Sequence, residues 1–288
     1  MRVRLITDSA CDITQSEAKE LDITILPLVI RMEGEEYLDG VTISADEFYK
    51  KLAHPKGFPT TKSVHTAAFS IALKPLIEAG DDVVIISLSG KLSNTVANAA
   101  EAADKIGGNV WVVDSKSATI GQNILVRYAV RLRDHGLMGH QIAQELERAK
   151  KHIHLIFRLD TLKYMMLGGR ISRIEAFFGT IMRAKPVLCL ENGEVCFLER
   201  PQGTRQSNSK LTEYVKKAGE IDFSMPVMMA YAGETRHLEE YIDSSRDFWA
   251  GREDSIPSAK IGATISTHGG LGVVAVAFFS SDYRIYHW

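Results

Sequence analysis

The chain has 288 residues, of which 45% are hydrophobic, and a formal net charge of −2. This length allows one large or two ordinary domains with well-filled cores, and the charge balance disfavours a broad nucleic-acid-binding surface. The three cysteines, Cys11, Cys189 and Cys196, have no C-x-x-C spacing, so they predict neither a disulfide framework nor a zinc site.

The first half of the chain alternates strand and helix patterns. The repeated order of strand, helix and strand predicts a parallel sheet with right-handed crossovers. The expected strands lie at 2–9, 23–34, 83–87 and 109–115, and the expected helices begin at Gln15 or cover 45–54, 66–80, 94–108 and 121–136.

The pattern changes in the second half, after a helix that begins at Gly139. Residues 185–201 read as two strands joined at Asn192-Gly193, which is the strongest short signal for a β-hairpin. A helix over 209–219, a strand over 225–233, a helix over 236–249 and a strand over 272–279 follow. We therefore predict two α/β domains, an N-terminal domain over 1–160 and a C-terminal domain over 161–288.

The segment that follows the strand at 83–87 carries Gly90 and Lys91 and resembles a phosphate-binding loop. The Walker pattern fails, because Ile85 stands where the first glycine belongs and Leu92 where the hydroxyl belongs. Ser93 is instead the expected N-cap of the following helix. A plain cap and a small-anion site at the carboxyl edge of the sheet are both consistent with this position.

Thr60 and Thr61 stand just ahead of another expected helix, so their hydroxyls can cap that helix or face a ligand. If Thr61 and Ser93 meet at one sheet edge, the two hydroxyls would form a clamp for a carboxylate or a phosphate. The turn at 7–12, with Thr7, Asp8, Cys11 and Asp12, follows the first strand and is expected at the same edge. We interpret Cys11 as a small buried thiol and Asp8 as a turn-capping residue.

Two further stretches allow both a structural and a ligand-binding interpretation. Arg170 follows the Gly168-Gly169 stop of a short helix, and His268 lies among glycines, which predicts a loop. Basic residues near the start of the second domain are solvated charges or a face for an acidic partner; they are Arg170, Arg173, Arg183, Lys185, Arg200 and Arg205. Hydrophobic residues of the same region suit a core or a flexible apolar tunnel; they are Tyr164, Met165, Met166, Leu167, Phe177, Phe178, Ile181 and Met182.

Taken in order, six stretches resemble the DegV family nearly from end to end. They are "ITDSACDI", "YLDGVTISADEFYKKL" followed by "PTT", "SGKLSNT", "VVDSKSA", "LDTLKYMMLGGRIS" and "KPVLCLENGEV". Members of this family bind a long-chain fatty acid and include the lipid-binding subunit of bacterial fatty acid kinase.

The resemblance implies a ligand tunnel between two α/β domains, with Thr61 and Ser93 bonded to the fatty acid carboxylate. Arg170 and His268 match family motifs and are expected near that head group. The resemblance further implies no catalytic residues, no cofactor and no metal in this chain, and a separate ATP-dependent kinase subunit that phosphorylates the bound fatty acid for phospholipid synthesis.

The sequence departs from the family pattern at three places next to these residues. Lys62-Ser63-Val64 replace the usual Ser-Gln-Pro after Thr61, Asn94 replaces a common glycine after Ser93, and the loop of His268 lacks the usual proline. The clamp residues are kept, so these changes bear on head-group contacts and on the choice of partner.

Two other functions are considered beside lipid binding. The first is a hydrolase or small-molecule kinase that uses the Thr7–Asp12 turn and Ser93, although the phosphate loop is missing and no local Ser-His-Asp or Cys-His spacing is seen. The second is a regulatory protein that binds DNA or another protein, which the charge balance and the lack of a helix-turn-helix signal disfavour. No apolar run is long enough to span a bilayer and no signal-peptide pattern is seen, so we expect a cytoplasmic protein without an integral membrane segment. We also expect no binding to nucleic acid.

Overall fold

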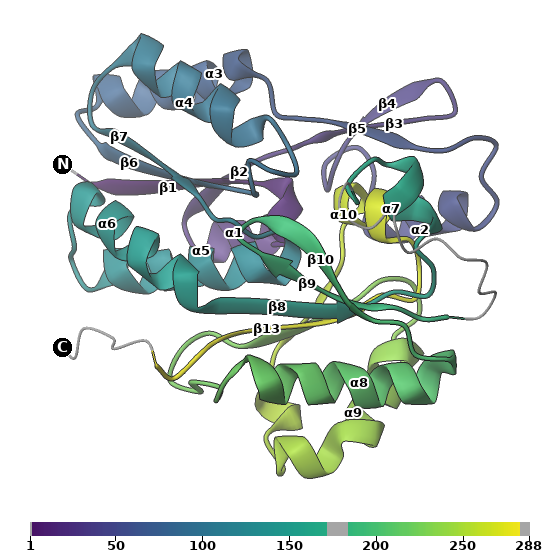
Figure 1. The fold of residues 1–288 in the computed structure, drawn as a ribbon. Helices are drawn as coiled ribbons and strands as arrows, with labels where there is room; N and C mark the ends of the chain where they lie inside the picture. The colour runs from purple at the N-terminus through teal and green to yellow at the C-terminus, as the bar shows by residue number, and fades with distance from the viewer. Residues whose placement is uncertain (1, 172–183, 283–288) are drawn as a thin grey trace.

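The structure is a computed structural model that describes residues 2–171 and 184–282. Its layers alternate between helices and sheets (Figure 1). The N-terminal half contains a parallel sheet with the strand order β2-β1-β6-β7, which confirms the expected parallel sheet. These strands are β1 (Val3–Asp8), β2 (Ile23–Leu26), β6 (Asp82–Ser87) and β7 (Val110–Asp114).

Helices cover both faces of this sheet (Figure 1). The strand β6 is buried along its whole length, as expected for a β-branched run with helices on either side. Two helices, α3 and α4, lie on the outer face, while α5 and α6 lie between the parallel sheet and a second sheet. Their bounds are α3 (Thr66–Glu78), α4 (Thr95–Ile106), α5 (Thr119–Asp134) and α6 (Gly139–Ala149).

The second sheet has six strands in the order β10-β9-β8-β13-β11-β12, and only β11 and β12 run parallel. Its outer face is covered by α8 (Gly203–Ala218) and α9 (Arg236–Trp249). The hairpin of β9 and β10 turns at Asn192 and Gly193, whose φ angles of 52° and 86° match the predicted turn. The strands are β8 (Ile153–Arg158), β9 (Val187–Glu191), β10 (Glu194–Glu199), β11 (Met228–Tyr231), β12 (Ser258–Lys260) and β13 (Val274–Phe279).

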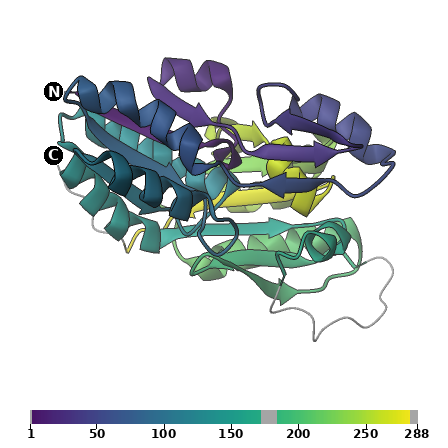
Figure 2. The same ribbon diagram turned by 90° about the horizontal axis from the view of Figure 1, so that it is seen from above.

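A small antiparallel sheet, in the order β4-β3-β5, lies beside the parallel sheet rather than on it (Figure 2). The short helix α10 contacts α2, α7 and both β3 and β5, so this corner joins segments from both ends of the chain. The remaining elements are α1 (Gln15–Glu20), β3 (Val29–Met32), β4 (Glu35–Leu38), α2 (Ala45–Ala53), β5 (Thr60–Lys62), α7 (Lys163–Leu167) and α10 (Ala263–Gly269), with short 3-10 turns at Ser9–Cys11, Lys150–His152 and Glu253–Ser255.

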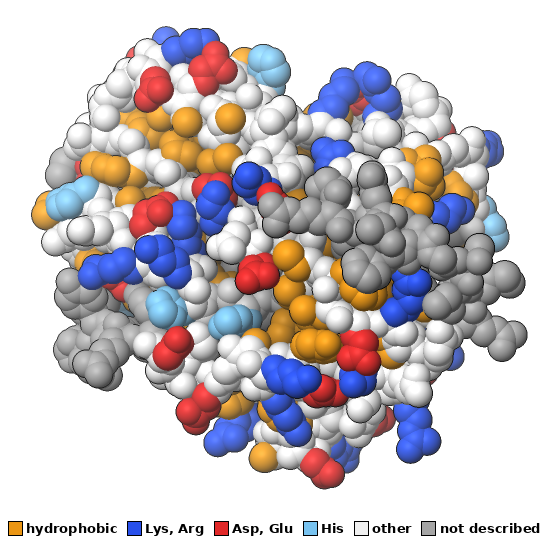
Figure 3. Space-filling model, in the orientation of Figure 1, with side chains coloured by type: hydrophobic (Ala, Val, Ile, Leu, Met, Phe, Trp, Pro, Cys, Tyr) orange, Lys and Arg blue, Asp and Glu red, His pale blue; other side chains and the backbone are white. Residues whose placement is uncertain are grey.

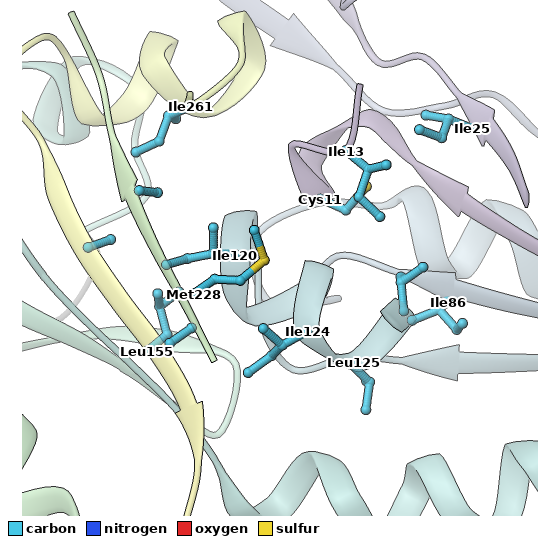
Figure 4. Close-up of a cluster of buried hydrophobic side chains, with 14 of the residues drawn as sticks. Cys11, Ile13, Ile25, Ile86, Ile120, Ile124, Leu125, Leu155, Met228 and Ile261 are labelled. Atoms are coloured by element: carbon cyan, nitrogen blue, oxygen red, sulfur yellow. The ribbon is translucent and has the colours of Figure 1, made fainter. Parts of the chain in front are cut away.

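The largest core cluster is continuous between the two sheets, because α5 packs against both of them (Figure 4). Ile120 and Ile124 on α5 lie between Cys11 on one side and Leu155 and Met228 on the other. A second cluster lies under α8 and α9, and a third lies under α3 and α4. The shared layer fixes how the edges of the two sheets face each other.

Strand β8 precedes residue 160 but pairs with β9 and β13 in the second sheet. The second sheet therefore includes residues that the sequence assigned to the N-terminal domain. The division into domains at 160 and 161 stays a prediction.

Candidate ligand-binding site

A cavity lies between the two halves of the chain, and its space free of atoms, about 840 Å³, includes space that is open to solvent. One side is an apolar wall from the second sheet, and the other combines apolar residues with a group of polar ones. The apolar wall consists of Leu155, Phe157, Leu190, Val195, Val273 and Ala275.

The structure brings Thr61, Ser93, Arg170 and His268 to this one cavity, although they come from four separate segments. Thr61 Oγ1 lies 2.9 Å from His268 Nε2. Arg170 Nε donates to the carbonyl of Leu92, directly before Ser93, at 3.3 Å. These contacts lie at one edge of the cavity. We call Thr61, Ser93, Arg170 and His268 together the polar edge.

Arg170 is held by two backbone carbonyls, since its Nη1 also donates to the carbonyl of Gly168 at 2.6 Å. Gly168 also lies against the imidazole of His268, so closely that a Cβ at this position would overlap Nδ1. The Gly-Gly stop after α7 thus leaves room for the imidazole as well as ending the helix.

The half-buried imidazole of His268 is neutral at physiological pH. Burial, and to a smaller extent the positive charge of Arg170, lower its pKa to about 4. Its Nδ1 atom is buried and has no hydrogen-bond partner in the described part of the chain. A hydroxyl and an imidazole in contact resemble a nucleophile and its base, but here no carboxylate orients the ring.

The structure corrects three local expectations. Thr60 and Thr61 do not cap α3, because they lie in β5 and His65 accepts from Ala67 N at 3.3 Å as the cap. Ser93 is not the N-cap of α4 either.

Asn94 takes the cap position without a side-chain bond, and Ser93 stands one residue earlier. Its hydroxyl still accepts from Thr95 N at 3.3 Å. His268 lies near the end of the helix α10 and not in a loop. The glycines around His268 predict a loop, but Asp12 and Asp39, which are distant in sequence, accept hydrogen bonds from the first turn of this helix.

The turn at 7–12 lies beneath this region and is almost completely buried. Cys11 is buried with a raised thiol pKa, as desolvation disfavours the thiolate, so it is the inert thiol that the sequence predicts. Asp8 accepts from Ala10 N at 3.2 Å and from Leu88 N at 2.9 Å. Burial raises the pKa of Asp8 to about 6. The predicted turn-capping role of Asp8 is confirmed.

The residues where the sequence departs from the family pattern differ in whether they line the cavity. Ser63 lines it and accepts from Asn98 Nδ2 at 3.2 Å, whereas Lys62 points to solvent and pairs with Glu36 at 2.6 Å. Gly270 has a φ of 74°, and a Cβ there would overlap the ring of Tyr164. The loop therefore needs this glycine although it lacks the proline.

The predicted basic face is only partly described. Lys185 pairs with Asp160 at 2.7 Å, and Arg200 lies over the ring of Phe197 at 5.8 Å. Acidic and basic side chains are interspersed on the face drawn in Figure 3. Among the named basic and hydrophobic residues, Arg173, Arg183, Phe177, Phe178, Ile181 and Met182 lie outside the described residues.

No group of three His, Cys, Asp or Glu side chains in 2–171 and 184–282 could hold a metal ion. No helix in those ranges is long and apolar enough to cross a membrane.

The sequence did not identify the apolar wall or the residues that hold α10. The two-residue period of a strand predicts which side chains of 153–158 and 273–279 share a face, but it does not distinguish a filled core from a cavity. Thr119 also lines the cavity, with a φ of 48°, which is unusual for a β-branched residue.

Comparison with known proteins gives consistent results. A family model described as an uncharacterised protein of the DegV family matches residues 2–281. A DegV domain-containing protein of Deinococcus radiodurans is 32% identical over 280 residues, which cover 96% of this chain and 98% of that protein. A DegV domain-containing protein of Caldanaerobacter subterraneus is 33% identical over 282 residues, which cover 96% of this chain and 98% of that protein.

Solved structures resemble the whole chain. A DegV family protein from Thermus thermophilus, described by its fatty acid binding, has 28% identity and a TM-score of 0.87, with 97% of this chain and 100% of that chain covered. DegV from Bacillus subtilis, described as a fatty acid binding protein, has 25% identity and a TM-score of 0.82, with 97% of this chain and 100% of that chain covered. The predicted α/β fold is thereby confirmed.

Proposed function

The chain belongs to the DegV family, and on this premise we propose that it binds a long-chain fatty acid and presents the carboxylate to a separate ATP-dependent kinase subunit. The observation that carries this proposal is the division of the cavity into an apolar wall and a polar edge. An acyl chain fits the first and a carboxylate fits the second. The fatty-acid binding described for the proteins from Thermus thermophilus and Bacillus subtilis supports it.

The acyl chain supplies most of the binding free energy. Burying a methylene is worth about 0.8 kcal/mol, so a chain of roughly fourteen gives on the order of 11 kcal/mol before ordering costs. This amount is enough to retain the lipid during purification. The polar edge then decides which way the chain lies in the cavity.

The contact of His268 with Thr61 orients the Thr61 hydroxyl toward the ligand. A neutral imidazole carries its proton on one nitrogen only. Because Nδ1 is buried without a hydrogen-bond partner among the described residues, we place the proton on Nε2, which then donates to Thr61 Oγ1 at 2.9 Å. The Thr61 hydroxyl is then free to donate to a carboxylate, beside the hydroxyl of Ser93.

The phosphoryl transfer itself belongs to the partner. A carboxylate oxygen attacks the γ-phosphorus of ATP, an acyl C–O–P linkage forms, and ADP leaves with the electron pair of the broken bond. We assign the chain no catalytic residue in this step. Its contribution is to hold the carboxylate in place.

Native mass spectrometry of the purified protein tests lipid binding. We expect a mass higher than that of the polypeptide by one long-chain fatty acid, which lipid analysis after denaturation then identifies. A protein that carries no lipid and takes up none of an added series of saturated and unsaturated fatty acids would contradict the proposal.

Presentation to a kinase is tested with ATP and hydroxylamine, which traps an acyl phosphate as a hydroxamate. We expect the hydroxamate only when the loaded protein and an ATP-dependent kinase subunit from the same organism are both present. ATP turnover or ester hydrolysis by the chain alone would favour the enzyme that uses the Thr7–Asp12 turn and Ser93. Salt-sensitive binding to duplex DNA would favour the regulatory alternative.

A further inference from the structure

The first turn of α10 is bound by two carboxylates from the N-terminal half. Gly262 N donates to Asp12 Oδ1 at 2.8 Å. Ala263 N and Thr264 N donate to the two oxygens of Asp39, at 3.1 and 3.3 Å. These backbone N–H groups have no partner within the helix, so the two aspartates supply the acceptors that this helix start needs.

The same helix brings four side chains or backbone positions to the cavity, which are Thr264, Ile265, His268 and Gly269. His268 follows the bound turn by four residues, or about one helical turn. A displacement of the first turn therefore changes the distance between His268 and Thr61, which lies on β5 in the N-terminal half.

Both aspartates are tied into further buried hydrogen bonds. Ser9 Oγ donates to Asp39 Oδ2 at 3.0 Å and accepts from Leu28 N, also at 3.0 Å. Asp12 accepts from the hydroxyl of Thr119, which lines the cavity with its unusual positive φ. The network thus reaches the cavity on two sides, through α10 and through Thr119.

Burying these two carboxylates is unfavourable, because no lysine or arginine forms an ion pair with either of them within the described residues. Desolvation raises the pKa of both, for Asp12 to about 8. Backbone N–H donors at the helix start compensate part of this cost, which ties the two aspartates to α10 in particular.

We propose that Asp12 and Asp39 are positioning residues of the ligand site, which fix α10 against the N-terminal half and thereby hold His268 on Thr61. The contacts stand on the geometry alone. The consequence for ligand binding rests on the proposed fatty acid site.

Asparagine can replace Asp12 without losing a hydrogen bond, but it cannot replace Asp39 in this way. Both oxygens of Asp39 accept from backbone N–H groups, so in Asp39→Asn the amide nitrogen must face one of these donors. Asp12 accepts from one backbone N–H and from a hydroxyl, which can reverse its role and donate or accept. Asp12→Asn therefore keeps both hydrogen bonds, whereas Asp12→Ala loses them.

Asp8 provides a matched control. It is a buried carboxylate of the same turn with a raised pKa, but its partners are Leu88 N, Ala10 N and Gln122, and none of them lies on α10. Asp8→Asn lowers stability without moving α10.

The experiment combines fatty acid affinity with the NMR signals of the histidine ring nitrogens in the full chain, with His268 assigned by its loss in His268→Asn. For Asp39→Asn we expect a shifted Nε2 signal of His268 and an affinity lower by about tenfold, the effect of one lost hydrogen bond with an unpaired donor. Asp12→Asn and Asp8→Asn are expected to keep the ring signal and the affinity of the unsubstituted chain. If Asp39→Asn does not fold, Asp12→Ala takes its place and is compared with Asp12→Asn.

An Asp39→Asn protein with an unchanged ring signal and affinity would overturn the inference, as would an equal loss in Asp8→Asn. The failure of the proposed function is recognised separately. If the unsubstituted chain binds no fatty acid, the ring signal of the lipid-free proteins still decides whether the aspartates position His268.

Discussion

The two sides of the cavity hold their side chains in place by different means. The apolar wall comes from neighbouring strands of one sheet, so its side chains are set by strand register and by packing. The polar edge joins segments that are up to about two hundred residues apart, through single hydrogen bonds such as the one between Thr61 and His268. We conclude that the wall responds to changes of volume, whereas the polar edge responds to the loss of individual contacts.

The largest predicted effect is a pH dependence of the free energy of unfolding, which arises from the buried Asp12. The pKa of Asp12 is about 8 in the folded protein, against 3.8 for an exposed Asp. Since the folded state holds the proton more tightly, the stabilising contribution of this proton is fully present below about pH 4 and is lost as the pH rises to about 8. The difference amounts to on the order of 5 kcal/mol, at 1.36 kcal/mol for each pKa unit.

Thermal unfolding at a series of pH values checks this expectation. Asp12→Asn cannot lose a proton, so its melting temperature relative to the unsubstituted chain should rise between pH 5 and about pH 8 and then level off. Parallel curves for the two proteins over this range would show that another group titrates.

The next effect concerns the apolar wall. Ala275 lines the cavity from β13, and its substitution by Trp fills space that the acyl chain needs. Displacing about four methylenes lowers the binding free energy by roughly 3 kcal/mol, or about a hundredfold in affinity. Affinity measurements on Ala275→Val, Ala275→Leu and Ala275→Trp should give a loss that grows with side-chain volume. An equal loss in all three would mean that the wall, like the polar edge, depends on specific contacts.

The difference between packing within one sheet and contacts between distant segments also explains what the sequence could predict. The buried strand β6 and the hairpin at Asn192-Gly193 are encoded by neighbouring residues, so local patterns identify them. Ser93 follows β6 at the edge of the parallel sheet, as chain order predicts. Thr61 lies instead in β5 of the small antiparallel sheet, so its place at the cavity does not follow from that edge.

Other features depend on residues that are distant in sequence. Glycines around His268 predict a loop, yet Asp12 and Asp39 bind the preceding turn and complete a helix. No local pattern in 261–272 contains that information. Likewise, the two-residue period of a strand indicates which side chains of β8 and β13 share a face, but the space in front of that face depends on how α5 separates the two sheets.

A smaller effect is expected from single hydroxyls at the polar edge. Thr61→Val keeps the shape of the side chain and removes its hydroxyl, so it loses one hydrogen bond to a charged carboxylate, worth about 1.5–3 kcal/mol. We expect fatty acid affinity to fall by roughly twentyfold. The control is Thr60→Val, because Thr60 is the preceding residue of β5 and is exposed. If both variants bind like the unsubstituted chain, the Thr61 hydroxyl does not contact the ligand.

The smallest effect tests the space around His268. Gly168 has an ordinary negative φ of −80°, so alanine is compatible with its backbone. The added Cβ would overlap the imidazole of His268 and would lie 3.1 Å from the carbonyl oxygen of Tyr164. The added methyl group should push the imidazole away from Thr61 and weaken fatty acid binding by about fivefold, since a neutral hydrogen bond contributes about 1 kcal/mol. Gly57→Ala serves as the control, as a Cβ at Gly57 meets no atom within 4 Å.

The signal of the His268 ring nitrogens distinguishes this displacement from a general loss of stability. A Gly168→Ala protein with weaker binding but an unchanged Nε2 signal would mean that the methyl group acts on Arg170, whose Nη1 donates to the Gly168 carbonyl. A shifted signal with unchanged binding would mean that the contact of His268 with Thr61 does not orient the carboxylate. Only the two changes together support a polar edge that depends on each of its contacts.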